Sequence, residues 1–226
     1  HDSKVLETLI PKICKIFREE NEELTGFENE EILAEYQIYK TPGYVYMKGN
    51  VQIYSAGKQA ADISAFPEGI AVAVGSEEDV PDICPDQTID KVFTIENLTS
   101  FYRFKQEHSL VIYLGGYHNR SRRNLLMQIY QKLPDAQYYH FGDLDAGGFY
   151  ILEHLKRKTG IPFQMFQMDI ETLKKYEDYA KPLTENDKKR LMQLEKMELP
   201  DEERKLITYM LQKGIKLEQE CISESQ

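Results

Sequence analysis

The sequence has no long apolar segment. Within its 226 residues, no apolar run approaches the roughly 20 residues that a membrane-spanning helix requires. The opening residues, HDSKVLETLI, contain no apolar stretch of the kind that a secretory signal needs. We therefore expect a protein without membrane contacts. An initiator methionine is also missing, which indicates part of a longer protein or a trimmed chain.

Cysteine is scarce as well. The three cysteines, Cys14, Cys84 and Cys221, lie far apart and form no CxxC pair. This spacing disfavours both a disulfide framework and a zinc site, and it indicates a reducing, cytoplasmic compartment. For Cys14 we expect a place in the core, on a helix.

Basic residues are outnumbered by acidic ones. The chain has 28 Lys and Arg against 38 Asp and Glu, a formal net charge of −10 and a pI near 5.1. This balance argues against a domain that holds nucleic acid through bulk positive charge. It does not exclude a DNA enzyme, because a carboxylate metal site adds negative charge and further domains can supply a basic surface.

The first part of the chain changes character along its length. Residues 4–20 have the apolar spacing of a helix, with Pro11 inside it, and an acidic loop follows. Residues 36–75 hold short β-branched and aromatic segments separated by Gly and Pro, which predicts strands and tight turns. Residues 76–90 contain two prolines and are expected to form a loop. We therefore expect an N-terminal helix with an acidic loop, a β-rich region, and an α/β core with a C-terminal helical extension, at residues 1–30, 31–85 and 86–226.

Apolar and amphipathic segments alternate from residue 91. The apolar segments KVFTIEN, SLVIYLGG, AQYYHFGDLD and IPFQMFQMD have the composition of buried strands, and helical segments such as LTSFYRFKQEH lie between them. This alternation predicts an α/β fold of Rossmann-like type, with a parallel sheet of about four strands and flanking helices. After residue 171 the chain is charged and helical in composition. There Thr184 and Asp187 predict a capping box, and Gly214 predicts a helix end.

Carboxylates mark the ends of two predicted strands. Asp143 and Asp145 end one strand, in HFGDLDAGG, and Glu96 ends another, in TIENL. The carboxyl ends of parallel strands form the edge where open α/β folds bind ligands. Close carboxylates repel unless a cation neutralises them, and oxygen donors suit Mg²⁺ or Mn²⁺. We therefore predict that these three acids hold a metal ion. The simpler interpretation of the Asp pair is a capping turn.

A basic segment follows the second predicted strand. GGYHNRSRR, residues 115–123, contains Arg120, Arg122 and Arg123 and no acidic residue. Glycines and arginines at the start of a helix suit phosphate binding, so these arginines are candidate contacts for DNA. An ordinary solvated first turn is the alternative.

Several strings together resemble a known family. TIENLTSF, YLGGYHNRSRRNLL, YHFGDLDAGGFYIL, LTENDKKRL and KLEQE, with DSKVLE near the start, resemble the C-terminal domain of the nuclease subunit of Wadjet plasmid-defence systems. The resemblance covers nearly the whole chain and is weakest across residues 20–85. That family is related to the A-type subunit of topoisomerase VI and to the meiotic double-strand-break protein. A Glu with a DxD is common to all Toprim proteins, whereas ENLTSF, GGYHN and LEQE are more specific.

The resemblance implies a Toprim fold, magnesium dependence and hydrolytic cleavage of double-stranded DNA. Glu96 matches the family's catalytic glutamate, and Asp143 and Asp145 match its metal-binding pair. Glu218 and Glu220 match a terminal acidic motif and are candidate accessory acids. The resemblance also implies partner subunits of a condensin-like, SMC-type defence complex, and we expect a homodimer.

Three other functions fit parts of the sequence. One is the metal-binding half of a tyrosine transesterase, whose nucleophile would lie in an upstream region; none of the 15 tyrosines matches it by motif. Another is an aspartate-nucleophile phosphatase, which Gly147 disfavours because Thr or Val is usual at that place. The third is a non-catalytic assembly module with a degenerate metal site, which the three intact carboxylates disfavour.

Overall fold

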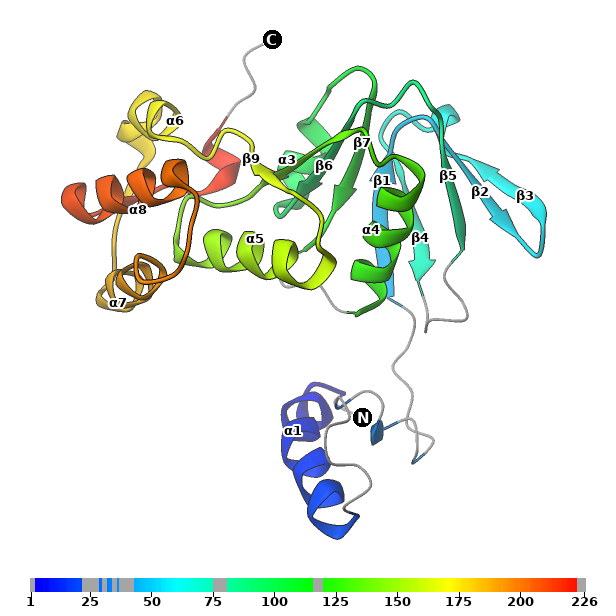
Figure 1. Cartoon of the computed structure of the whole chain (residues 1–226), viewed down its shortest axis with the longest axis horizontal. Coiled ribbons are helices and arrows are strands. Elements are labelled where there is room, and N and C mark those ends of the chain that lie inside the picture. Colours follow the sequence, from blue (N-terminus) through cyan, green and yellow to red (C-terminus); the bar gives the residue numbers. More distant parts are fainter. Residues whose placement is uncertain are drawn as a thin grey trace. The chain divides into compact units, whose positions relative to one another are not determined.

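The computed structural model, drawn in Figure 1, describes part of the chain, and the chain divides into two compact units, His1–Pro42 and Gly43–Gln226. The strand expected at residues 36–40 and the acidic residues 22–28 fall largely or wholly outside the described part, as does most of GGYHN. Among the helices that can be described, none combines the length and apolar character that crossing a membrane requires. The described residues are 3–21, 29, 32–33, 36, 43–74, 81–115 and 120–222.

The N-terminal unit contains the helix α1 (Ser3–Glu20), and Pro11 lies inside this helix without ending it. Cys14 is fully buried and shares a small core with Ile32 and Leu33. The expectation of a core cysteine on a helix is confirmed. Cys14 is a free thiol, as are the other two cysteines of the chain.

Parallel strands form the centre of the second unit. β7 (Ser109–Tyr113), β6 (Lys91–Ile95), β8 (Gln137–Phe141) and β9 (Gln164–Met165) lie side by side in that order. Each neighbouring pair is parallel. The predicted parallel sheet of about four strands is therefore confirmed. Because β8 lies next to β6 rather than β7, the carboxyl ends of β6 and β8 are adjacent.

The β-rich region extends this sheet and builds another. β1 (Gly43–Lys48) pairs antiparallel with both β7 and β4 (Ile70–Val74), so the main sheet has six strands. A separate sheet has the order β3 (Lys58–Asp62), β2 (Val51–Ser55) and β5 (Asp82–Pro85). β1 and β4 thus share one sheet with strands of the core, and the domain boundaries expected after residues 30 and 85 stay predictions.

Strand β5 corrects the expected loop at residues 76–90. Its backbone pairs with β2, and its Ile83 is fully buried. The Ile83 N–H donates to the side chain of Gln128 at 2.9 Å, and its carbonyl accepts from Lys132 at 2.7 Å, both on the neighbouring helix. Pro81 precedes the strand and Pro85 ends it, where a missing N–H is tolerated. Pairing with a distant strand is what makes this segment extended, and the local pattern does not show it.

Hydrophobic cores lie on both faces of the main sheet. Since neighbouring strand residues point to opposite faces, Val92 packs in the core that contains α4 (Arg120–Lys132), whereas Phe93 packs in the core that contains α3 (Leu98–Arg103). Helix α5 (Ala146–Thr159) contributes residues to both cores. Helix α3 is shorter than predicted, because Phe104 leaves the helical conformation and is buried in the core.

The C-terminal extension gathers at the β9 end of the sheet, as Figure 1 shows. The short strands of this extension pair with each other, and a bridge between Leu144 and Leu217 ties its end to the segment after β8. The predicted helical extension, the capping box and the glycine helix end are all present. In chain order the elements are α6 (Ile170–Lys175), η4 (Glu177–Tyr179), β10 (Lys181–Pro182), α7 (Glu185–Leu194), α8 (Asp201–Lys213), β11 (Ile215–Lys216) and η5 (Gln219–Cys221); η2 (Ile63–Ala65) lies earlier, after β3.

An ion pair holds α7 against β11. The buried carboxylate of Asp187 accepts hydrogen bonds from Lys216 Nζ at 2.9 Å and from the Thr184 N–H at 2.9 Å. Burial would raise the pKa of Asp187, but the hydrogen bonds from Lys216 and Thr184 outweigh it and lower the pKa to about 2. The charged form of Asp187 therefore stabilises the folded state.

Asp187→Asn should lower the free energy of unfolding by about 1–2 kcal/mol near neutral pH, because Lys216 loses its charged partner. The folded-state pKa lies below the ordinary value of 3.8, so this contribution is complete above that value and is lost as the pH falls toward 2. Urea unfolding across this range should show the difference between variant and wild type shrinking in acid. Glu185→Gln removes an exposed ion pair with Lys188 from the same helix and should change stability by less than about 0.5 kcal/mol. Equal stability of Asp187→Asn and wild type near neutral pH would contradict this role.

Candidate functional site

Two loops meet at the carboxyl edge of the parallel sheet. Glu96 follows β6, whereas Asp143 and Asp145 follow β8. The two strands are neighbours, and the Glu96 N–H donates to the carbonyl of Phe141, the last residue of β8, at 3.2 Å. The structure therefore brings all three sequence-predicted acids to the same edge.

Glu96 is held from below by the sheet. Its side chain is only 10% exposed, and its Oε1 lies 2.8 Å from Nε2 of the fully buried His140. Gly142 lies next to this contact, and a Cβ atom there would be 2.4 Å from Glu96 Oε1. A residue with a side chain would displace the carboxylate, so the glycine in HFGDLD is explained by close approach.

Asp143 is the acid most affected by its neighbours. Burial is the largest cause that raises the pKa of Asp143 to about 6, and the charges of Glu96, Asp145 and Glu218 also raise it. A hydrogen bond from the backbone N–H of Gln219 to Asp143 Oδ1, at 2.7 Å, acts in the opposite direction. The direction of the shift means that the fold crowds like charges around a partly buried carboxyl group.

Asp145 is the N-cap of α5. Its Oδ1 accepts the Gly148 N–H at 2.9 Å, which satisfies one of the free donors at the start of the helix. Gly148 packs against the preceding turn so closely that a Cβ atom would lie 2.2 Å from the Asp143 carbonyl oxygen. The capping interpretation of the Asp pair thus applies to Asp145. It leaves the second carboxylate oxygen of Asp145 available for another partner.

A cavity of about 120 Å³ opens between the two loops and the C-terminal segment. Glu218 and Glu220, the candidate accessory acids, line it beside the two aspartates, whereas Glu96 is not part of the lining. No sequence pattern pointed to Asn97 or Lys216 as members of this site. The lining residues are Asn97, Asp143, Asp145, Lys216, Leu217, Glu218 and Glu220.

Gln219 connects the parts of this site. Its side-chain oxygen accepts the Asn97 N–H at 2.8 Å, while its own N–H donates to Asp143. It is fully buried, so neither hydrogen bond is shared with bulk water. One residue of η5 therefore joins the loop after β6 to the loop after β8. Its position inside the LEQE string was the available sequence signal, but the string alone does not show where it folds.

The predicted phosphate-binding arginines have contacts with other parts of the fold. Arg120 begins α4, but its side chain lies outside the described residues. Arg122 donates to the carbonyl of Tyr44 on β1 at 3.4 Å, and the charge of Arg123 acts on His154 of α5. A phosphate-binding role for these arginines stays a prediction.

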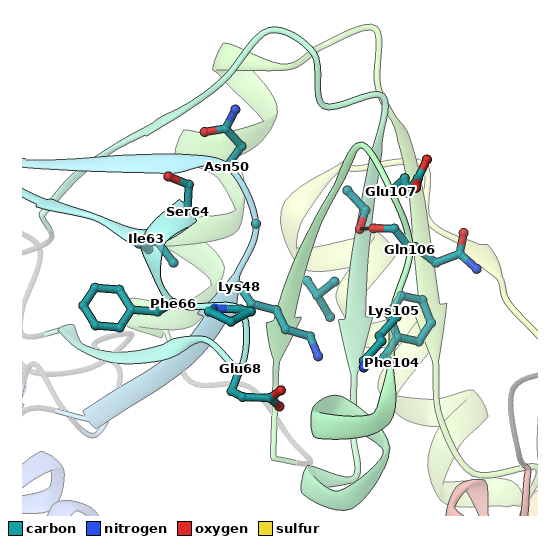
Figure 2. A pocket seen from close by; sticks show the side chains of 14 residues that line it. Lys48, Asn50, Ile63, Ser64, Phe66, Glu68, Phe104, Lys105, Gln106 and Glu107 are labelled. Atoms are coloured by element: carbon teal, nitrogen blue, oxygen red, sulfur yellow. Dashed lines mark hydrogen bonds between the residues drawn. The ribbon is translucent and has the colours of Figure 1, made fainter. Parts of the chain in front are cut away.

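A larger hollow of about 840 Å³ lies at the opposite edge of the sheet, where β7 begins (Figure 2). Lys48 and the loop before β7 contribute to its wall, together with Phe66. The ammonium group of Lys48 donates to the carbonyl of Tyr102 at 3.3 Å and lies 4.8 Å from the centre of the Phe101 ring. These contacts fix Lys48 to α3, far from the carboxylate edge.

The carboxylate edge has the right donors for a hard cation but not a finished site. Within the described residues, no three acidic, histidine or cysteine side chains are arranged so that they could hold a metal ion together. Carboxylate oxygens are nevertheless the donors that Mg²⁺ and Mn²⁺ prefer, and a cation would relieve the repulsion around Asp143. The donor set therefore fits such an ion, provided that the side chains turn toward it.

The site lies within a region that matches a known family. The family model described as "Wadjet protein JetD, C-terminal" matches residues 78–226. The chain belongs to the Wadjet JetD family. A curated relative, the Wadjet protein JetD of Bacillus cereus (strain Q1), is 29% identical over 226 residues, which cover 98% of this chain and 54% of the relative. The chain thus spans about half the length of that JetD protein, and the matched region contains every acid of the site from Glu96 to Glu220.

Asp143→Asn should stabilise the cation-free chain at neutral pH. Because the folded-state pKa of about 6 lies above the ordinary value of 3.8, the stability linked to protonated Asp143 is complete below 3.8 and is lost as the pH rises through 6. Asparagine stays neutral and can still accept the Gln219 N–H. Thermal melting in EDTA should therefore show the variant gaining on wild type as the pH rises across this window.

The control for this experiment is Asp169→Asn. Asp169 is an exposed N-cap that accepts the Thr172 N–H at 2.7 Å, and asparagine caps about equally well. Its difference from wild type should stay flat between the two pH limits. If the Asp143→Asn difference is flat as well, Asp143 does not experience the crowding of charges described above.

Proposed function

We propose that this chain is the metal-dependent catalytic part of a Wadjet subunit that cleaves double-stranded plasmid DNA by hydrolysis. The observation that carries the proposal is the position of Asp143, which is partly buried at a strand end among the charges of Glu96, Asp145 and Glu218. Such an arrangement costs stability unless a cation is bound. Membership of the Wadjet JetD family supports the same function. A Toprim fold and a relation to the A-type subunit of topoisomerase VI are parts of this proposal.

Each acid has a distinct role in the proposal. Glu96, Asp143 and Asp145 would hold Mg²⁺ or Mn²⁺, and Glu96 would also act as general acid or base. When bound, the cation would stabilise charge on the scissile phosphate and the departing oxygen. Glu218 and Glu220, on the wall of the same cavity, would act as accessory acids.

DNA binding depends on more than this chain. A net charge of −10 opposes binding to a polyanion, so we propose that the rest of the protein and its partners supply the basic surface. The proposed partners are the condensin-like, SMC-type subunits of the defence complex and a second copy of the protein. We place the complex in the cytoplasm, as the free cysteines suggest.

A second candidate, the non-catalytic assembly module, is supported by one observation. Among the described residues no ready metal cluster exists, because Glu96 is engaged by His140 and Asp145 by the start of α5. On this alternative, Asp145 is a capping residue and nothing more. Substitutions of Asp145 separate the two functions.

Asp145→Asn should retain folding and lose cleavage. Asparagine is as good an N-cap as aspartate, so the melting temperature should stay close to that of wild type. The neutral amide is a poorer ligand for Mg²⁺, so cleavage of plasmid by the full-length protein with its partner subunits should fall by at least about 100-fold. Asp145→Ala loses the cap too and should also be destabilised by about 1 kcal/mol. Plasmid cleavage in Mg²⁺ and in Mn²⁺, run beside thermal melting, measures both effects.

The control is again Asp169→Asn, which caps α6 far from the cavity and should cleave like wild type. Asp143→Asn should behave like Asp145→Asn in the cleavage assay. If both variants cleave plasmid at the wild-type rate, the carboxylates are not part of a catalytic centre. Absence of cleavage by the wild-type complex itself would favour the assembly module.

A further inference from the structure

A buried histidine stands beside Glu96 on the interior of the sheet. Thr94 on β6 and His140 on β8 are register partners on neighbouring parallel strands, and both are 0% exposed. Glu96 lies two residues beyond Thr94, so the alternation of side chains along β6 brings it to the same face. Thr94, His140 and Glu96 therefore form a short row that leads from the interior of the sheet to its carboxyl edge.

Hydrogen bonds link this row. His140 Nε2 lies 2.8 Å from Glu96 Oε1, and its Nδ1 lies 2.9 Å from Thr94 Oγ1. An ionised carboxylate only accepts hydrogen bonds, so Nε2 must carry a proton and donate it to Glu96. The Thr94 hydroxyl also lies 3.2 Å from the Tyr139 carbonyl. It can donate to an unprotonated Nδ1, or accept from Nδ1–H and donate to Tyr139, so either state of the ring is satisfied.

We propose that His140 is a positioning residue that fixes the Glu96 carboxylate for binding a divalent cation. Its hydrogen bond occupies Oε1, whereas Oε2 has no hydrogen-bond partner among the described residues. Without a fixed donor, repulsion from Asp143 would favour a Glu96 side chain turned away from the site. Because the ring is fully buried in a strand, it is a more rigid anchor than a loop residue. Outer donors of this kind orient metal-binding carboxylates.

Gly142 gives independent support for this pairing. A Cβ atom at residue 142 would lie 2.4 Å from Glu96 Oε1 and 2.9 Å from His140 Nε2. The nearest obstruction is the end of a flexible side chain, so an added methyl group would displace the carboxylate rather than disrupt the backbone. Gly142→Ala should therefore break the pair from the outside while leaving both partners present.

The hydrogen bond itself can be tested without cation or DNA. Long-range ¹H–¹⁵N NMR of the histidine rings in this chain should show His140 protonated at Nε2. Glu96→Gln and Gly142→Ala should both shift the Nε2 signal, whereas His108→Asn, which changes an exposed histidine, should leave it in place. An unprotonated Nε2, or an Nε2 signal unmoved by Glu96→Gln, would overturn the pairing.

The consequence for the site rests on the proposed function and is measured by binding of Mn²⁺ to the same chain by calorimetry. His140→Phe should weaken binding about 10- to 100-fold, as loss of an outer hydrogen bond to a metal ligand typically does. His140→Gln keeps an N–H that can reach Glu96 and should recover part of that loss. His108→Asn should bind like wild type. Gly142→Ala should match His140→Phe, which keeps the test valid if the larger ring fails to fold.

The outcomes separate this inference from the proposed function. Wild-type Mn²⁺ affinity in folded His140→Phe and Gly142→Ala would overturn the positioning role and leave a metal-dependent function intact. If the wild-type chain binds no Mn²⁺, the metal-dependent function fails at this site, and the positioning role falls with it even where NMR shows the hydrogen bond. Equal losses of affinity in His140→Phe and His140→Gln would mean that the lost N–H is not the cause.

Discussion

Repulsion between carboxylates at one edge of the sheet is the constraint to which the surrounding structure responds. Glu96, Asp143, Asp145 and Glu218 come from three separate segments, yet each of the other charges acts on Asp143. Around this crowding, the fold supplies donors: His140 to Glu96, the Gln219 N–H to Asp143, and the start of α5 to Asp145. These donors explain how the fold tolerates the charges, and what remains unneutralised is the physical reason to expect a cation.

The C-terminal extension is part of the site rather than an appendage to it. The Leu144–Leu217 bridge and the buried ion pair of Asp187 with Lys216 bring the last described segment back to the sheet. Gln219 then bonds to both strand-end loops at once. Stability of the extension and geometry of the carboxylates are therefore coupled, since loss of the first would release Asp143 from one of its hydrogen bonds.

The acidic character of the chain has a local and a global aspect. Locally, acids at the carboxyl edge suit a cation and a phosphate bound through it. Globally, a net charge of −10 opposes approach to DNA. The chain spans about half the length of its JetD relative, so the division of labour we propose assigns chemistry to this half and DNA binding to the remainder and its partners.

The sequence by itself determined the elements that depend on neighbours along the chain. The apolar runs at β6, β7 and β8, the Thr184–Asp187 capping box and the αL glycine at residue 214 all follow from local pattern. The position of Asp143 and Asp145 after a buried strand was equally visible. Tertiary structure decided the rest: the order that places β6 beside β8, the strand β5, the His140–Glu96 pair and the hydrogen bonds by which Gln219 joins the two loops. These features are hydrogen bonds between residues 44 to 122 positions apart, or pairings of distant strands, and no local pattern encodes which distant partner a backbone or side chain will meet.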